Sequence, residues 1–236
     1  MSALDINLIA VALYLLAAGY LFISLWRQHP IRRQSLYLLT ALALIAHGTG
    51  CAKLIIQPQG LALNLFPMLS LIFCTVNIVV LLSAARKPLH NLFILLFPLT
   101  IVAIVSSLLP VNNNALLPLT LGLASHVLLS ILAYSLLTIA TLQALFLAFQ
   151  NHRLKHKRSL GPSGLLPPLQ TMESLLFELL WAGQLLLTGA IVSGVIFLDD
   201  LFAQHVVHKT VFTLLAWLIY SILLWGRHSL GWRGYT

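Results

Sequence analysis

The stretch ALLPLTLGLASHVLLSILAYSLLTIATLQALFLAFQ, residues 115–150, is an unbroken apolar run with a single histidine, His126, near its start. As one helix it is about 50 Å long, whereas the hydrocarbon core of a bilayer is about 30 Å thick. We therefore expect its first two thirds to span a membrane and its last turns to enter water at the basic segment 151–158. An imidazole inside such a span is costly and usually faces protein, a cofactor or a cavity, so His126 is the first candidate functional residue. Polar side chains on the same run are the expected partners of its ring: Ser125, Ser130 and Tyr134.

The composition of the whole chain is that of a membrane protein. Of its 236 residues, 60% are hydrophobic and only 8% are charged, which excludes an ordinary soluble domain. No basic residue precedes the first apolar segment, so we interpret it as a retained transmembrane helix and not as a cleavable signal peptide. Each apolar segment is long enough to span, the fourth by the smallest margin. We predict an all-α polytopic transmembrane helical bundle, a single domain over 1–236, with about seven helices at 5–26, 35–56, 62–83, 91–109, 117–149, 173–198 and 208–226.

The basic residues indicate the orientation of this bundle. Almost all of them follow the first, third, fifth and seventh segments, and the longest connection, 150–172, is basic and contains proline and glycine. We therefore predict the N-terminus outside, the C-terminus inside and this loop in the cytosol. The net charge of +8 is a topology signal and not a nucleic-acid footprint, because the basic residues are divided among these connections: Arg27, Arg32, Arg33, Arg86, Lys87, Arg153, Lys155, Lys157, Arg158, Arg227 and Arg233.

A second histidine, His47, lies in the predicted helix 35–56 within the sequence AHGTGCAK, residues 46–53. The small residues around it allow another helix or a flat ligand to approach the backbone closely. Counted from the helix ends, His47 and His126 lie at similar depth in the outer half of the membrane. Two histidines at one depth on separate helices are the arrangement that bis-imidazole haem ligation requires. The alternative is plain helix packing, with His47 hydrogen-bonded to a neighbour.

The last predicted outer loop is the most polar outer segment, and it carries His205 and His208 three residues apart. On a helix these two side chains share a face. With Asp199 or Asp200 they would make a metal site, or one of them would be an axial ligand from the rim. The alternative is a solvated loop with its histidines at the interface.

Other chemistry finds little support in the sequence. Neither CxxC nor CxxCH occurs, so thiol exchange and covalent haem attachment lack their motifs, and Cys51 and Cys74 are interpreted as packing thiols. Phosphate-binding, nucleophile-elbow and zinc-protease motifs are also missing from the sequence. Glu173 and Glu178 open a predicted helix, where we expect them to be surface or capping charges.

Three stretches of the chain form a pattern that a known family shares. They are SHVLLSILAY (125–134), LTGAIVSG (187–194), and His208-Lys209-Thr210 followed by LLAWLIY (214–220) and GWRG (231–234). In turn they resemble the histidine-bearing helix, the helix leading into the outer haem-facing loop and the helix leaving that loop in the cytochrome c assembly family. This haem-handling membrane family includes CcsA, CcmC and the HemX and YpjD branches. The first four predicted helices are most similar to the YpjD branch.

The resemblance implies a role for each candidate histidine. His126 corresponds to the outer-side haem histidine of the family, and His47 matches a histidine on the equivalent helix of YpjD-like members. His205 and His208 lie where haem is met, without a motif of their own. The tryptophan-rich motif of the synthetase and haem-delivery members is missing from the outer loop, so the resemblance implies an assembly factor and not a haem lyase.

We therefore expect non-covalent haem b binding in the outer half of the membrane, with His47 and His126 as axial ligands of the iron and His205 or His208 as substitutes or gate. The expected role is haem handling or regulation in cytochrome c biogenesis at the bacterial inner membrane. Expected partners are haem, the lipid bilayer and other cytochrome biogenesis membrane proteins, with no nucleic acid. Two alternatives stay open: a quinone-linked electron-transfer subunit of the cytochrome b type, and a structural or scaffold membrane subunit without haem.

Overall fold

The computed structural model describes residues 2–27, 31–58, 60–84, 90–109, 116–117, 120–156, 168–197 and 207–232. Within these residues the protein has seven α-helices, one 3-10 turn and three very short strands, which confirms the prediction of an all-α fold. The described residues fall into two compact units, the first within Met1–Leu119 and the second within Thr120–Gly161 and Pro167–Thr236. The single domain over 1–236 stays a prediction.

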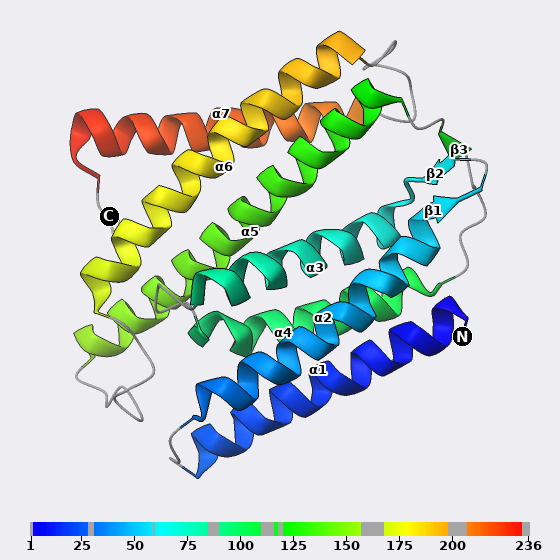
Figure 1. Cartoon of the computed structure of the whole chain (residues 1–236). Coiled ribbons are helices and arrows are strands. Elements are labelled where there is room, and N and C mark those ends of the chain that lie inside the picture. The colour runs from blue at the N-terminus through cyan, green and yellow to red at the C-terminus, as the bar shows by residue number, and fades with distance from the viewer. Residues whose placement is uncertain are drawn as a thin grey trace. The chain divides into compact units, whose positions relative to one another are not determined.

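The first unit is a ring of four helices in which each helix contacts the next and the last returns to the first (Figure 1). Its core is largely aromatic where the first and fourth helices meet. The ring of Tyr14 lies 5.6 Å from that of Phe97, and Phe97 stacks on Phe93 with the ring centroids 4.9 Å apart. All three side chains are fully buried. The four helices are α1 (Ala3–Trp26), α2 (Arg33–Ile55), α3 (Leu65–Ala84) and α4 (Phe93–Ser107).

Two short antiparallel strands connect α2 to α3 in the first unit, and a third strand, which follows α4, pairs with the second of them. The three strands are β1 (Ile56–Gln57), β2 (Gly60–Ala62) and β3 (Leu116–Leu117), and β2 lies between the other two. The turn from β1 to β2 ends at Gly60, whose φ of 145° favours glycine over any side-chain-bearing residue. These strands cannot be predicted from the sequence, because two or three residues are too few to show an alternating apolar pattern.

The second unit consists of α5 (Leu121–Lys155), α6 (Leu169–Phe197) and α7 (Val207–Leu230). α5 and α6 run antiparallel along most of their length, and α7 crosses them (Figure 1). α5 begins at Leu121 because the Thr120 hydroxyl caps it by accepting from the backbone N–H of Leu123 at 3.2 Å. The buried core is built from alanine, leucine and methionine side chains: Ala133, Leu137, Ala140, Leu147, Met172, Leu176, Leu180, Leu187 and Leu224.

Within the described residues, six helices are long and apolar enough to cross a membrane, and α4 is the shorter exception. This confirms a polytopic helical bundle. The 15 residues of α4 extend over only about 22 Å, because the 3-10 turn His90–Leu92 takes the start of the segment expected at 91–109. The 35 residues of α5 extend over about 52 Å, so one end of α5 passes beyond the hydrocarbon as the sequence predicts. The orientation of the termini stays a prediction.

Candidate functional site

His47 lies fully buried in the core of the first unit. It belongs to α2, and both of its ring nitrogens contact hydroxyl groups on neighbouring helices. Nε2 lies 2.9 Å from Oγ of Ser70 on α3, and Nδ1 lies 3.4 Å from the hydroxyl of Tyr14 on α1. The Tyr14 ring stands edge-on to the imidazole, with the centroids 5.8 Å apart. A metal bound at either nitrogen would therefore have to displace a hydroxyl partner.

Small residues near His47 let the helices pack closely, as the sequence predicts. A Cβ atom on Gly50 would overlap the side-chain amide of Asn7 on α1. The thiol of Cys51 lies 3.5 Å from Oγ of Ser70, and Cys51 and Cys74 are both buried and free. This confirms the interpretation of the two cysteines as packing residues. The surroundings of His47 are those of a tightly packed helix interface in which both ring nitrogens have hydroxyl partners.

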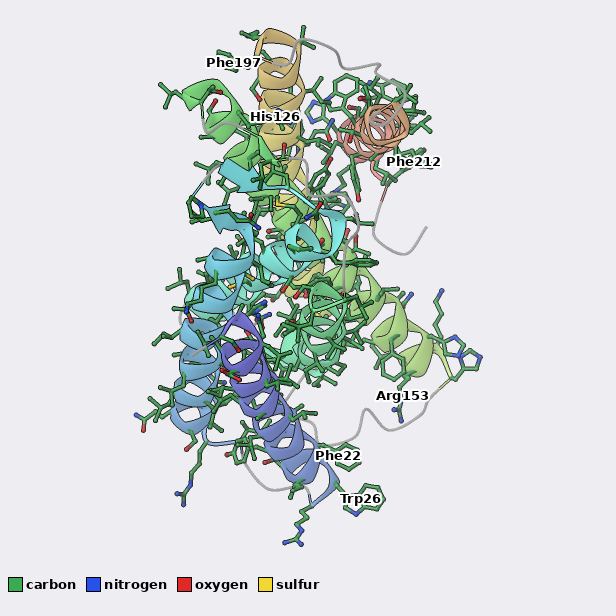
Figure 2. All side chains as sticks on the ribbon, turned by 90° about the vertical axis from the view of Figure 1, so that its right-hand side faces the viewer. Phe22, Trp26, His126, Arg153, Phe197 and Phe212 are labelled. Atoms are coloured by element: carbon green, nitrogen blue, oxygen red, sulfur yellow. The ribbon has the colours of Figure 1, made fainter. Side chains whose placement is uncertain are left out.

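His126 has a different setting, in the second unit. It lies in the second turn of α5, near the end of α6 marked by Phe197, and its side chain is half-buried (Figure 2). Its Nδ1 atom lies 3.0 Å from the carbonyl oxygen of Ala190 and 3.1 Å from Oγ of Ser193, both on α6. Ser193 donates its own hydroxyl proton to the same carbonyl at 2.8 Å. Because a carbonyl oxygen only accepts, Nδ1 of His126 is the donor and Nε2 carries the lone pair.

Among the residues that the structure describes, Nε2 of His126 has no hydrogen-bond partner. Histidines that ligate metals almost always donate their other ring N–H to a carbonyl, carboxylate or water, which fixes the tautomer and the ring orientation. Ala190 and Ser193 impose this restraint on His126. His126 therefore combines a fixed tautomer with an available nitrogen, whereas His47 has neither nitrogen available.

The hydrogen-bond partners of the His126 ring do not lie on its own helix, where the sequence predicts them. The Ser125 hydroxyl donates to the backbone carbonyl of Gly122 at 2.8 Å, and the Tyr134 hydroxyl lies 2.9 Å from Oγ1 of Thr213 on α7. The contacts to the ring come from α6 instead, 64 and 67 residues further along the chain. The small residues of the LTGAIVSG stretch were the available signal, because they allow α6 to approach α5 closely.

α7 is attached to the other two helices of its unit by polar side chains spaced along one of its faces. Glu173, expected to be a surface or capping charge, instead forms a partly buried ion pair of 2.6 Å with Arg227 of α7. The Arg227 guanidinium also lies over the ring of Phe177, 4.5 Å from its centroid. The remaining contacts are hydrogen bonds: Tyr134 with Thr213 at 2.9 Å, Trp217 Nε1 to Thr188 Oγ1 at 2.9 Å, and Gln184 Nε2 to Ser221 Oγ at 2.7 Å.

The structure does not test the other predicted ligands. His205 lies outside the described residues, as do Asp199, Asp200 and much of the loop 150–172. His208 is in the first turn of α7, and its side chain lies outside the described part. His47 and His126 belong to different units, so their pairing and their common depth stay predictions. In the described part of the chain, no group of three or more His, Cys, Asp or Glu side chains could hold a metal ion.

The fold and the candidate site define a class of protein: a multi-pass helical membrane protein in which a histidine near one end of a long helix has one ring nitrogen hydrogen-bonded and the other available. Residues 35–236 match the model of the family described as Cytochrome C assembly protein. The chain belongs to this family, which confirms the resemblance found in its sequence. Membership points to an assembly factor with a haem-related role in cytochrome c biogenesis.

The inner membrane protein YpjD of Escherichia coli K12 is 29% identical to this chain over 233 residues, which cover 96% of this chain and 87% of that protein. The YpjD proteins of E. coli O6:H1 and O157:H7 match to the same extent. No solved structure matches. Helices of spanning length together with these relatives make the chain a multi-pass inner membrane protein.

Proposed function

We propose that this chain binds haem b non-covalently in the outer half of the membrane and serves haem handling or regulation in cytochrome c biogenesis. The observation that carries the proposal is the setting of His126. Ala190 and Ser193 accept its Nδ1 proton, so the Nε2 lone pair is oriented and available to a metal without prior rearrangement. Family membership is the reason to expect haem iron as that metal.

The residues around His126 fit a haem-binding role. Imidazole nitrogen is a common axial ligand of haem iron, and bound haem would supply a redox-active iron at this position. The hydrogen bond to a backbone carbonyl of α6 holds the ring direction even if nearby side chains move. Leu129, less than one turn further along α5, lies opposite Gly189 of α6 and supplies an apolar side chain one turn from His126.

The second axial ligand in this proposal comes from the start of α7 or from α2. α7 begins at the same end of the second unit at which His126 lies (Figure 1), so His208 in its first turn is the leading candidate, with His205 just before it. His47 is the alternative, and it would first have to leave Ser70 or Tyr14. A bis-histidine iron is the proposed coordination in either case.

The proposal is tested by the absorption spectrum of detergent-purified protein, with and without added haem. We expect a low-spin haem b spectrum in the wild type and its loss in His126→Ala. His228→Ala is the matched control, because His228 is an exposed histidine at the end of α7, and its spectrum should equal that of the wild type. A colourless wild type that fails to take up added haem contradicts the proposal, and so does full haem retention in His126→Ala.

A second set of variants identifies the other axial ligand. Removing it should convert the low-spin spectrum into a high-spin one while haem stays attached through His126. We expect this conversion in the His205→Ala/His208→Ala double variant and an unchanged spin state in His47→Ala. The opposite result would assign the second ligand to His47, and an unchanged spectrum in both would contradict bis-histidine coordination by this set.

A further inference from the structure

The end of α5 opposite to His126 carries two exposed histidines one turn apart. The rings of His152 and His156 lie with their centroids 4.2 Å apart and their planes inclined by 37°. Nδ1 of His156 donates to the backbone carbonyl of His152 at 2.8 Å, which leaves Nε2 of His156 with the lone pair. Among the described residues, neither Nε2 atom has a hydrogen-bond partner. His126, at the other end of the helix, likewise donates from Nδ1 to a backbone carbonyl and carries its lone pair on Nε2.

An apolar strip continues from these histidines toward the membrane along the same face of α5. Leu145, Phe149, His152 and His156 follow one another at intervals of four, three and four residues, so they share a face. The side chains of Leu145 and Phe149 are 55% and 53% exposed within the protein. One continuous exposed surface therefore changes from aliphatic and aromatic side chains at Leu145 and Phe149 to imidazoles at His152 and His156.

Positive charges flank the histidine pair. The Arg153 guanidinium lies over the ring of Phe149, 5.6 Å from its centroid, and Lys155 is exposed on the other flank (Figure 2 shows Arg153 at this end of α5). Two cations beside the imidazoles repel a bare divalent metal ion and attract an anionic ligand. A ligand that suits the whole surface has a metal centre for the imidazole, a flat apolar body for Phe149 and carboxylates for the two cations.

We infer that His152, His156, Phe149, Arg153 and Lys155 form a second haem site, a receiving site at the end of α5 that the basic residues assign to the cytosol. Nε2 of one histidine would be the ligand of the haem iron, Phe149 would give the porphyrin an apolar contact, and Arg153 and Lys155 would attract the propionates. The two imidazoles stack on one side, so they cannot take both axial positions of one iron, and the site holds haem by a single histidine at a time.

This inference takes its ligand from the proposed function but uses different residues. His126 and His152 are 26 positions apart on one continuous helix, or about 39 Å, which is more than the hydrocarbon thickness. A single histidine gives a weaker, high-spin complex, which suits haem that is exchanged and not retained. The spin state and the affinity therefore separate the receiving site from the site at His126.

The test is a titration of ferric haem into the full-length protein in lipid nanodiscs, followed by the Soret band and by electron paramagnetic resonance. We expect a tight low-spin phase and a weaker high-spin phase in the wild type. His152→Ala/His156→Ala should weaken the second phase at least tenfold and leave the first unchanged, and His126→Ala should do the reverse. His228→Ala is the control for haem that binds any exposed histidine.

The outcomes separate this inference from the proposed function. If the wild type shows the high-spin phase but no low-spin phase, the function proposed for His126 is contradicted and the receiving site is still supported. A high-spin phase that persists in His152→Ala/His156→Ala would show that haem partitions into lipid and would overturn the receiving site. An equal reduction in His228→Ala would show that haem binds any exposed histidine and would also overturn it.

Two further probes test the chemistry of the receiving site. Haem dimethyl ester lacks the propionate charges, so the affinity of its histidine-dependent high-spin phase should be several-fold lower than that of haem. Arg153→Gln/Lys155→Gln should lower the affinity for haem to that for the ester. Equal affinity for the two porphyrins would overturn the role of the cations. Histidine-dependent binding of Ni²⁺ without a histidine-dependent haem phase would make this a bare metal-ion site and overturn the proposal.

Discussion

The two histidines that the sequence places inside the membrane use their ring nitrogens in opposite ways. His47 in the first unit is fully buried and hydrogen-bonded at both nitrogens. His126 in the second unit is half-buried, with one nitrogen on a backbone carbonyl and the other available. A deeply buried imidazole is stable only when both nitrogens have partners, and those partners occupy the lone pair that a metal needs. We therefore propose that the fully paired His47 stabilises the fold and that His126, with one nitrogen available, is the ligand.

The largest expected effect that tests this comparison is on stability. His47→Ala should lower the free energy of unfolding of the haem-free protein by about 2–4 kcal/mol, because it leaves a cavity and two hydroxyls without their partner. His126→Ala should lower it by less than about 1 kcal/mol, because the ring is half-exposed and Ser193 keeps its bond to Ala190. Denaturant unfolding of both variants in detergent checks the difference. Equal losses would remove the distinction between the two histidines.

A smaller effect is expected for the serines that contact the two rings. Ser193→Ala should weaken haem binding about tenfold, because the His126 ring loses one of two restraints and the Ala190 carbonyl remains. Ser70→Ala is the matched variant in the first unit, and it should leave haem affinity unchanged while lowering stability by about 1 kcal/mol. Haem titration measures the affinity of both variants for haem, and denaturant unfolding measures their stability. A Ser70→Ala variant with weakened haem binding would place His47 at the iron.

The smallest effect is expected for Tyr14→Phe. The hydrogen bond from Tyr14 to His47 is long, at 3.4 Å, and the phenyl ring retains its packing on Phe97, so the loss of stability should be only about 0.5 kcal/mol. Thermal unfolding of the haem-free variant beside the wild type measures it. A loss above 2 kcal/mol would mean that the tyrosine hydroxyl, and not Ser70, is the main partner of His47.

The sequence was sufficient for the membrane class, the seven helices and the length of α5, because long apolar runs between charged loops have few other structures available. It also identified His47 and His126, since an imidazole inside an apolar run stands out by composition alone. It could not tell them apart. The partners that distinguish them, Ser70 and Ser193, are common small residues whose importance arises only when separate helices pack together.

The same limit explains the errors at the edges of the helices. α4 is shorter than expected because the turn at His90–Leu92 has no clear signal within an apolar run. The ion pair of Glu173 with Arg227 joins residues 54 positions apart. Local sequence pattern does not reveal such a partner, and it predicts a surface charge for the glutamate. In both cases tertiary contacts decided a feature that local pattern left open.

The most direct test of the central claim is chemical rescue of His126→Gly with imidazole. The variant is purified, checked for an unchanged size-exclusion profile and mixed with haem, and the low-spin spectrum is recorded before and after free imidazole is added. We predict that the signal is absent before the addition and returns with it, because imidazole replaces the missing ligand in the space left by the side chain. A low-spin spectrum in His126→Gly before any imidazole is added would show that the iron takes its ligand elsewhere and would contradict the account.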